Sequence, residues 1–508
     1  MKRVVSLLIA TAVAAATLAL AAPAQAWDSG NANGTEPVLS GDNLTMCAIR
    51  ETASIYCWGS NSSGQLGRGT GNAATLTVAT VLSPASKPAR SISVNSSTAC
   101  AVLLNRTVAC WGANTDGRVG NGSTGAYVDT PTVIPSFTNV ANVSVGTPPP
   151  LGAGAACAVK QDGTVWCWGN PSWAGFTGFP SGVHASPVKV AGITNAVDVS
   201  VGLSNVCAVL ITKRIVCWGA NNIGQLGDGG NAAHTGLRTV TGITDAVAVG
   251  LGSDNACALR VGGKISCWGD NTYGSLGANS TVSYSPVPLA VYGVTGATSF
   301  AMSPFGGCAT ISGIAKCWGS NDLGRIGDGQ FVTATAPAKA TAGLALPKAT
   351  SVWSSYWGSC EIADAGRVWC WGNGAGGRLG NGTTTNYDAG VGTGPGNSFG
   401  YAADPTRVTL LNSAPGKPTG SSTAVHKIKI TWAAPSTSGG AAAPKDYLVQ
   451  WRLKGSSTWH TFSHTATTSR SATVTGLSAG KYYQFRVYAK NWAGTGSVSS
   501  VSNYIKSR

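Results

Sequence analysis

The sequence predicts an all-β protein built largely from seven repeats, each the size of a four-stranded propeller blade. Glycine accounts for 69 of the 508 residues and only 10% are charged, so the residues that fill exposed helix faces are scarce. Seventeen tryptophans accompany many Val, Thr and Ser, which favour short strands and tight turns. Cysteine pairs recur every 50 to 57 residues, a period that suits one propeller blade.

Residues 1–26 are predicted to be a signal peptide. A positive start at Lys2 and Arg3, an apolar run over 4–20 and a small-x-small sequence ending at Ala26 are typical of one. An uncleaved membrane anchor is the alternative, which the polar chain after residue 26 disfavours. We therefore expect a soluble mature protein that is secreted and extracellular.

Fourteen cysteines form seven regularly spaced pairs. Six pairs are ten residues apart and one is nine; no CxxC motif accompanies them, which disfavours zinc. We predict seven disulfides, one in each repeat, formed in an oxidising compartment. The predicted pairs are Cys47–Cys57, Cys100–Cys110, Cys157–Cys167, Cys207–Cys217, Cys257–Cys267, Cys308–Cys317 and Cys360–Cys370.

The spacing of each pair fits a β-hairpin. Between Cys157 and Cys167, a three-residue loop ending in Gly163 would join two strands, with the glycine in the left-handed conformation of a bulge. Counting outward along the hairpin places the two cysteines on a non-hydrogen-bonded pair, whose Cα atoms lie about 4.5 Å apart. The pair with nine-residue spacing has a two-residue loop, Ser312-Gly313, which restores the same pairing.

A second motif begins at the second cysteine of each repeat. Residues 57–67 read Cys-Trp-Gly-Ser-Asn-Ser-Ser-Gly-Gln-Leu-Gly, and closely related segments begin at Cys217 and Cys317. Because Cys and Trp are adjacent on a strand they point to opposite faces, so we expect the Trp to pack against a neighbouring blade. The glycines and the asparagine suit a tight turn, and we interpret them as structural.

These repeats resemble those of the regulator of chromosome condensation family over roughly residues 38–411, although the third repeat loses the turn pattern after its Cys-Trp-Gly. The resemblance implies a seven-bladed β-propeller, which we place at 27–412. It also implies binding without chemistry. The family's founding activity is nucleotide exchange on a small nuclear GTPase, a partner that a signal peptide would put out of reach. Other members are secreted and bind proteins, including bacterial propellers that inhibit β-lactamases.

Residues 413–508 are predicted to form a separate β-sandwich. The cysteines stop, a Pro/Gly-rich linker appears and alternating strand-like runs follow. Residues 476–487 resemble the corner of a fibronectin type III domain, an immunoglobulin-like fold. By this resemblance Tyr483 would be the corner tyrosine, with Phe485 and Val487 facing inward, and Trp432 would be the core tryptophan of an early strand.

The positive charge is concentrated in this C-terminal domain. Residues 413–508 hold 12 Lys and Arg and one acid, Asp446, whereas residues 27–412 hold 20 basic and 18 acidic residues. Such a domain is attracted to polyanions at low salt, and outside a cell these include wall teichoic acids, anionic lipids, acidic glycans and DNA. Charge scattered for solubility is the alternative. No nucleic-acid fold signature is present, so we expect no specific nucleic-acid partner.

The sequence contains no recognisable catalytic, cofactor or metal motif. The five histidines are scattered, and no Ser-His-Asp elbow, P-loop or His-Glu-x-x-His motif occurs. Asp228, Asp270 and Asp328 could converge in a ring, as the paired carboxylates of a glycosidase do, but local turn bonding explains them better. We therefore predict no catalytic residues, no cofactor and no metal, with a glycoside hydrolase as the alternative.

Aromatic residues gather on one predicted face of the propeller. In an up-and-down blade the first and third connections share a face, and several of these connections carry large aromatic residues where other repeats have small polar ones. An exposed patch of this kind would bind a protein or a glycan; the alternative is that the rings fill gaps under long loops. The candidate partner-binding residues are Trp173, Phe176, Phe179, Phe305, Tyr356, Trp357, Phe399 and Tyr401.

These observations predict a secreted, monomeric, non-catalytic binding or scaffold protein of bacterial type. The propeller face would bind an extracellular protein or glycan, and the basic domain would favour anionic cell-wall polymers. Two alternatives remain. One is an extracellular polysaccharide-acting enzyme or accessory, since fibronectin type III domains often accompany bacterial polysaccharide hydrolases. The other is an inhibitor of an extracellular enzyme.

Overall fold

The computed structural model contains strands and their connections, without a helix, in the residues that it describes. These are residues 38–42, 45–49, 54–69, 75–81, 88–146, 154–170, 177–340, 348–363, 367–374, 378–380, 401–407, 414–435, 444–491 and 494–508. A search of them for a helix long and apolar enough to cross a membrane finds none. The predicted signal peptide and the predicted domain boundary at residue 413 lie outside the described residues.

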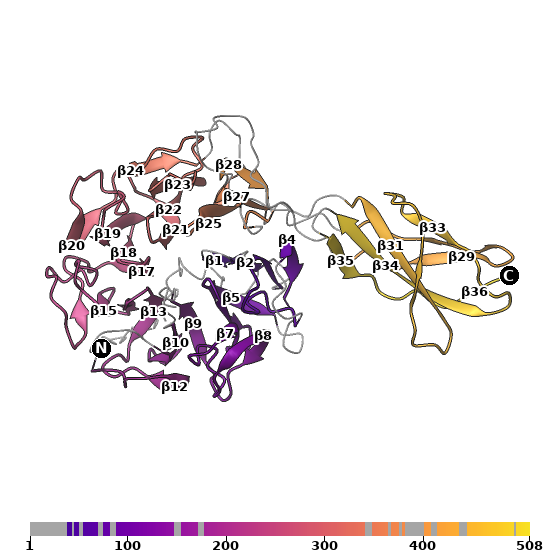
Figure 1. Cartoon of the computed structure of the whole chain (residues 1–508), viewed down its shortest axis with the longest axis horizontal. Coiled ribbons are helices and arrows are strands. Elements are labelled where there is room, and N and C mark those ends of the chain that lie inside the picture. Colours follow the sequence, from indigo (N-terminus) through magenta and orange to yellow (C-terminus); the bar gives the residue numbers. More distant parts are fainter. Residues whose placement is uncertain are drawn as a thin grey trace, which may run out of the picture.

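Seven four-stranded antiparallel sheets follow one another along the described chain, each built from four consecutive strands. Figure 1 shows them arranged radially around a common axis, which is the architecture of a β-propeller and confirms the predicted fold class. We number the blades 1–7 in chain order. Their strands are β1–β4 (Val38–Gly41, Thr45–Ile49, Ile55–Gly59, Thr75–Thr80), β5–β8 (Ala89–Val94, Thr98–Leu103, Val108–Asn114, Gly125–Val133), β9–β12 (Val140–Val145, Ala155–Lys160, Val165–Gly169, His184–Lys189), β13–β16 (Ala196–Val201, Asn205–Leu210, Ile215–Gly219, Arg238–Thr239), β17–β20 (Ala246–Leu251, Asn255–Arg260, Lys264–Asp270, Tyr284–Ala290), β21–β24 (Ala297–Ser303, Gly306–Ile311, Ile314–Gly319, Ala334–Lys339) and β25–β28 (Ala349–Ser354, Gly358–Ala363, Arg367–Asn373, Tyr401–Arg407).

The disulfides lie where the cysteine spacing predicts them. In blade 3, β10 and β11 pair so that Cys157 lies directly opposite Cys167, and Gly163 in the connecting loop has a φ of 78°. In blade 6 the shorter loop has positive φ at both Ser312 and Gly313, as a two-residue hairpin turn requires. All seven blades contain the predicted bond, with Cα–Cα distances of 4.0–4.1 Å, so each disulfide ties the two central strands of one blade.

The tryptophan after each second cysteine joins adjacent blades. In blade 5 the Trp268 side chain is fully buried, and its Nε1–H donates to the main-chain carbonyl of Gln225 in blade 4 at 3.1 Å. Gly227 lies in the same turn of blade 4 with a φ of 67°, and a Cβ atom there would lie 2.8 Å from the Trp268 ring. The glycine of the repeat therefore leaves room for the tryptophan of the next blade. Equivalent hydrogen bonds are made by Trp58, Trp111, Trp168, Trp318 and Trp371.

The ring closes by packing rather than by exchange of a strand, as far as the described residues extend. β1 belongs to blade 1 and β28 to blade 7, and the strand order in both sheets follows the chain. The Trp58 Nε1–H of blade 1 donates to the Arg378 carbonyl of blade 7 at 2.9 Å. Leu39 and Ile362 pack in one hydrophobic cluster at the same seam. The first and last blades are thus joined by the same tryptophan-to-carbonyl hydrogen bond that joins blades adjacent in the sequence.

The C-terminal domain is a two-sheet sandwich. One sheet has the order β29-β30-β33 (Thr419–Ala424, Lys427–Thr431, Ser471–Val474), and the other β32-β31-β34-β35 (His460–Phe462, Asp446–Leu453, Tyr482–Asn491, Gly494–Val498), with β36 (Ile505–Lys506) also paired to β34. Phe485, Val487 and Trp432 are buried between the sheets, as predicted. The Ser478 N–H donates to the Tyr483 hydroxyl at 2.8 Å, which is the hydrogen bond of a tyrosine corner.

Candidate functional site

The first and third connections of neighbouring blades meet on one face of the ring. The first connection of blade 6 joins β21 to β22, and the third connection of blade 5 joins β19 to β20. Tyr273 of that third connection packs edge-on against Phe305 of the first, with ring centroids 4.8 Å apart. Side chains from two blades and two kinds of connection therefore form one surface.

Four aromatic side chains form a continuous row across blades 5–7, and we call this row the aromatic ladder: Tyr273, Phe305, Tyr356 and Trp357. The ring centroids of Phe305 and Tyr356 lie 4.8 Å apart, and those of Tyr356 and Trp357 4.6 Å apart. Tyr273 is 43% exposed, and the other three are partly buried. Partly exposed rings that are held by one another suit an interface, because little conformational freedom is lost when a partner binds.

Two arginines from third connections pack against the ladder. The guanidinium of Arg325 in blade 6 lies 5.3 Å from the centroid of Phe305 and 5.7 Å from that of Tyr356. Its Nε–H donates to the Tyr356 main-chain carbonyl at 2.5 Å, which holds the loop of blade 7 in place. The guanidinium of Arg378 in blade 7 lies 5.0 Å from the centroid of Trp357. Each arginine therefore supports one part of the row.

Burial lowers the pKa of both arginines. For Arg325 desolvation is the largest cause, and the Asp322 carboxylate, 2.7 Å from its Nη1, opposes it. Desolvation lowers the pKa of Arg378 to about 10, so this guanidinium stays charged near neutral pH. A cation held against a ring away from water is attracted to it more strongly than an exposed one. The ladder is thus backed by positive charge.

The structure brings together Phe305, Tyr356 and Trp357 of the predicted residues. Trp173, Phe176 and Phe399 lie outside the described residues, and so does the side chain of Tyr401, whose backbone begins β28.

Phe179 does not belong to an exposed surface, and this part of the prediction is wrong. Its side chain is 6% exposed and packs in one hydrophobic cluster with Val190 of blade 3 and Trp218 of blade 4. Its ring also lies edge-on to His184, with centroids 5.1 Å apart. The described end of the third connection, residues 177–183, contacts blade 4 through the Thr177 N–H, which donates to the Thr235 carbonyl, so Phe179 fills a gap at the seam between blades 3 and 4.

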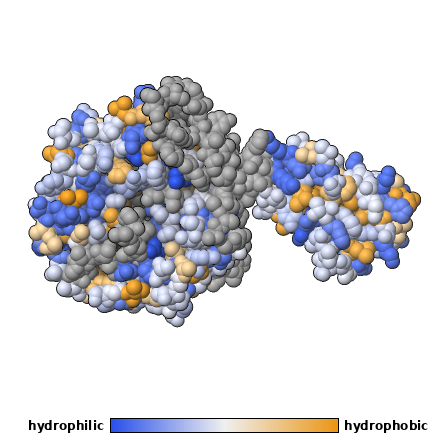
Figure 2. Space-filling model, viewed as in Figure 1, coloured by the Kyte–Doolittle hydropathy of each residue, from blue (hydrophilic) through white to orange (hydrophobic). Residues whose placement is uncertain are grey.

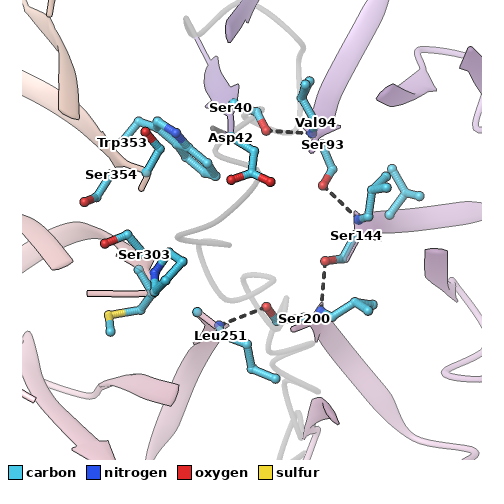
Figure 3. Close-up of a pocket in the computed structure, with 18 of the residues that line it drawn as sticks. Ser40, Asp42, Ser93, Val94, Ser144, Ser200, Leu251, Ser303, Trp353 and Ser354 are labelled. Atoms are coloured by element: carbon cyan, nitrogen blue, oxygen red, sulfur yellow. Dashed lines mark hydrogen bonds between the residues drawn. The ribbon is translucent and has the colours of Figure 1, made fainter. Parts of the chain in front are cut away.

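Serine hydroxyls line the axis of the propeller and link the innermost strands of blades 1–5 (Figure 3). Each serine lies opposite the first cysteine of its blade and accepts a hydrogen bond from an innermost-strand N–H of the next blade, at 3.0–3.2 Å. The acceptors are Ser40, Ser93, Ser144 and Ser200. The equivalent residues of blades 5–7 are Gly250, Ala301 and Trp353, so the series stops on the side of the ring that carries the ladder.

A small cavity lies on the axis of the propeller. Its volume is about 60 Å³. Pro304 and Ser355 line it and directly precede Phe305 and Tyr356 in the chain, so the ladder begins beside the mouth of the cavity. In Figure 2 the described surface of the propeller is mostly hydrophilic on the side shown, with hydrophobic residues as isolated spots.

The acidic residues within the described ranges do not assemble a recognisable catalytic centre. Burial raises the pKa of the Asp254 carboxyl, and the negative charge of Asp270 raises it further. Asp270 accepts hydrogen bonds from the Thr272 hydroxyl and N–H, and Asp228 and Asp328 accept from main-chain N–H groups two residues on, as predicted for turns. Among the described residues, no group of three or more His, Cys, Asp or Glu is placed to hold a metal ion.

Sequence reasoning missed Tyr273, Arg325 and Arg378. Tyr273 precedes the first glycine of its turn, where blades 1 and 4 have Ser63 and Ile223. The same comparison between repeats that singled out Phe305 would have found it. The arginines occupy the Gln position of the Gly-Gln-Leu-Gly segment, and only the contact across the connections reveals that they meet the aromatic rings.

Comparisons with known proteins agree with this architecture. The sequence profile of the fibronectin type III domain matches residues 413–504, and profiles of the regulator of chromosome condensation (RCC1) repeat match residues 246–275 and 365–419. The chain therefore carries RCC1 repeats in a seven-bladed propeller, followed by a C-terminal fibronectin type III domain.

Solved structures have the same propeller. Prp20p of Saccharomyces cerevisiae, described with its binding to Gsp1p and histones, is 20% identical, with a TM-score of 0.58 over 70% of this chain and 86% of its own. Human WBSCR16 is 18% identical, with a TM-score of 0.56 over 65% of this chain and 88% of its own. Both similarities show a shared fold. Protein turtle of Drosophila melanogaster is 36% identical over 74 residues, which span 15% of this chain and 5% of that protein.

Proposed function

We propose that the protein is a secreted, non-catalytic binding or scaffold protein whose aromatic ladder binds an extracellular protein or glycan. The observation that carries this proposal is that two blades depart from the repeat at two positions that meet in space. Blade 6 combines Phe305 with Arg325, where blade 4 is built with Ser204 and Gln225. Blade 7 has the same combination of an aromatic residue and an arginine, in Trp357 and Arg378. Since blade 4 forms without an aromatic residue or an arginine at these positions, the blade fold does not require them, which supports a role in recognition.

An extracellular location is supported by the seven disulfides, which persist in oxidising surroundings. The charged start and apolar run of residues 1–26 support export. A bacterial cell surface is the setting that we propose, because the C-terminal domain is strongly basic and bacterial wall polymers are anionic. The partners named for Prp20p are not proposed for this chain, because at 20% identity the similarity shows the fold alone.

A polysaccharide-acting enzyme is the second candidate, favoured by one observation. In blade 5 burial raises the pKa of the Asp254 carboxyl and the charge of Asp270 raises it further, and raised carboxyl pKa values are common among catalytic acids. We propose binding in preference, since Asp270 is already held by Thr272. Release of reducing sugar from cell-wall polysaccharide by the full chain, lost in Asp254→Asn, would favour the enzyme.

The binding proposal is tested by comparing two immobilised variants with the unmodified chain. Phe305→Ala/Tyr356→Ala removes two rings of the ladder, and Tyr292→Ala/Phe331→Ala removes two exposed rings elsewhere on blades 5 and 6. Secreted proteins and solubilised surface glycans are passed over each. Truncating aromatic residues at the centre of an interface costs at least about 2 kcal/mol, or roughly 30-fold in Kd. We expect material retained by the unmodified chain and the control to be lost from the ladder variant.

Retention of the same material by the ladder variant contradicts the proposal, and so does a failure of the unmodified chain to retain anything. Unchanged unfolding midpoints establish that the substitutions act on binding rather than on folding.

A further inference from the structure

The outward face of the larger sandwich sheet carries cations and aromatic rings on neighbouring strands. In β31 and β34 alternate residues point into the core, so the residues between them form the outer face. We call this surface the cationic face. It comprises Arg452, Lys454, Trp459, Tyr482, Arg486, Tyr488, Tyr504 and Lys506.

The two arginines of this face are held in fixed positions. The guanidiniums of Arg452 and Arg486 lie 4.7 and 4.2 Å from the ring centroid of Trp459. Arg452 donates from Nε and Nη2 to Gln484 Oε1, at 3.2 and 2.9 Å, and Arg486 donates from Nε to Gln450 Oε1 at 2.8 Å. The remaining N–H groups can still bind an anion. Because the side chains are already ordered, an anionic ligand would lose less entropy in organising them.

Two lysines extend the face along the strands. The Lys454 ammonium lies 5.6 Å from the ring centroid of Tyr482 and 5.3 Å from that of Tyr504, and the Lys506 ammonium lies 5.9 Å from that of Tyr482. Residues two apart on a strand are about 7 Å apart, so the cations form successive rows along β31 and β34. The arrangement is elongated, which suits a linear ligand.

Within the part of the chain that the structure describes, no carboxylate forms an ion pair with these four cations. Asp446 is the one acid of residues 413–508, and it lies 3.9 Å from Lys490 and 4.0 Å from His464. Positive groups that repel one another and lack an internal counterion are favourable places for an external one. The partner that complements them carries several negative charges.

We propose that the cationic face binds a linear acidic polysaccharide, with its sulfate or carboxylate groups on Arg452 and Arg486 and its chain running along β31 and β34. This inference rests on the proposed function, in which the basic domain holds the protein at a cell surface. Cations lie over the rings of Trp459 and Tyr482. The faces of these rings are therefore less accessible to stacked bases than the exposed aromatic rings of proteins that bind single-stranded nucleic acids. The ligand is recognised by its charges rather than by base stacking.

Binding of the full chain to labelled dextran sulfate and to polygalacturonate tests the proposal, with uncharged dextran, poly(dT) and phosphatidylglycerol vesicles as comparison ligands. Arg452→Gln/Arg486→Gln is expected to raise Kd by roughly 30-fold or more, since each arginine loses charge-assisted hydrogen bonds. Lys427→Gln/Lys429→Gln removes the same charge from exposed positions on β30 of the other sheet. This matched control is expected to change Kd by less than about 3-fold.

A third variant tests the role of the Trp459 ring without changing the charge of the cationic face. Trp459→Leu leaves both arginines charged but removes the ring that orients them. We expect it to weaken binding while the dependence of Kd on salt keeps its slope, because the number of charges is the same.

The outcomes separate the site from the function. If both double variants lose affinity equally, the charge acts diffusely; the cationic face is then wrong, although anchoring by the domain stands. If the unmodified chain binds neither acidic polysaccharide, both the cationic face and the proposed anchoring by the basic domain are wrong. Tighter binding to poly(dT) or to the vesicles overturns the ligand class.

Discussion

Glu361 is a buried acid at a position that is alanine in the other six blades. It follows the first cysteine of blade 7, in β26, and its side chain is among the most buried in the chain, the residue being 1% exposed. Its Oε1 has no hydrogen-bond partner within the described part of the chain. Burial raises the pKa of the carboxyl from 4.5 to about 7. The equivalent alanines are Ala48, Ala101, Ala158, Ala208, Ala258 and Ala309.

This residue should make the protein less stable as the pH rises. Between about pH 4.5 and 7 the folded chain keeps a proton on Glu361 that the unfolded chain has lost, so the free energy of unfolding falls across this window, by up to about 3 kcal/mol. Glu361→Gln removes this decline. Urea unfolding of both proteins at pH 4 and pH 8 measures it: the variant should be more stable at pH 8, with a smaller difference at pH 4. An equal difference at the two pH values would show that Glu361 does not titrate in this range.

At the scale of the element, the turn after each Trp-Gly is shaped by the next blade. Gly227 needs both a positive φ and the absence of a side chain, because a Cβ atom would meet Trp268. Gly242 has a similar φ of 71°, but nothing lies within 4 Å of a Cβ position. A substitution at Gly242 therefore measures the cost of the left-handed backbone alone, without a steric clash.

Alanine at the two glycines should therefore have different effects. Gly242→Ala should lower the free energy of unfolding by about 1–2 kcal/mol, the cost of a left-handed non-glycine residue. Gly227→Ala should lower it by roughly 1–3 kcal/mol more, since it also overpacks the seam between blades 4 and 5. Denaturant unfolding measures both, and equal losses would mean that the seam adapts to a methyl group.

Each disulfide stabilises one hairpin. In the loop-entropy model, closing about eleven residues contributes roughly 2.5–3 kcal/mol. Cys207→Ala/Cys217→Ala should lower the free energy of unfolding by about this amount while the far-UV spectrum keeps its β-sheet form. Loss of all folded structure would instead mean that one bond supports the entire ring.

Much of the structure of a blade was predictable from the sequence, because equivalent positions can be compared among the seven repeats. Cysteine spacing alone gives the register of Cys157 with Cys167, and the same comparison singles out Phe305 and Trp357 as departures. The burial of Phe179 was not predictable, since it depends on a hydrophobic cluster that combines residues of blades 3 and 4. The placement of Arg325 against Tyr356 depends on a contact between blades that no single repeat contains.

At the scale of the molecule, the ring depends on seven packed seams. Trp58 at the closing seam and Trp111 at the seam between blades 1 and 2 make the same hydrogen bond to the preceding blade. Trp58→Ala and Trp111→Ala should therefore cost similar amounts, about 3–5 kcal/mol each, by removing a buried ring. Urea unfolding measures the two losses. A much smaller loss for Trp58→Ala would mean that the terminal blades are poorly joined.

We propose that recognition lies on one sector of the propeller, in blades 5–7, and that surface attachment lies on the C-terminal sandwich; Figure 1 shows the strands of both. Blades 5–7 carry the ladder and interrupt the serine series, whereas the inner strands of blades 1–5 are linked by regular hydrogen bonds. The most direct test is hydrogen–deuterium exchange of the full chain with and without its captured partner. Slower exchange is expected at residues 303–307 and 354–359. Protection confined to blades 2–4, with these two connections unchanged, would contradict the ladder as the binding site.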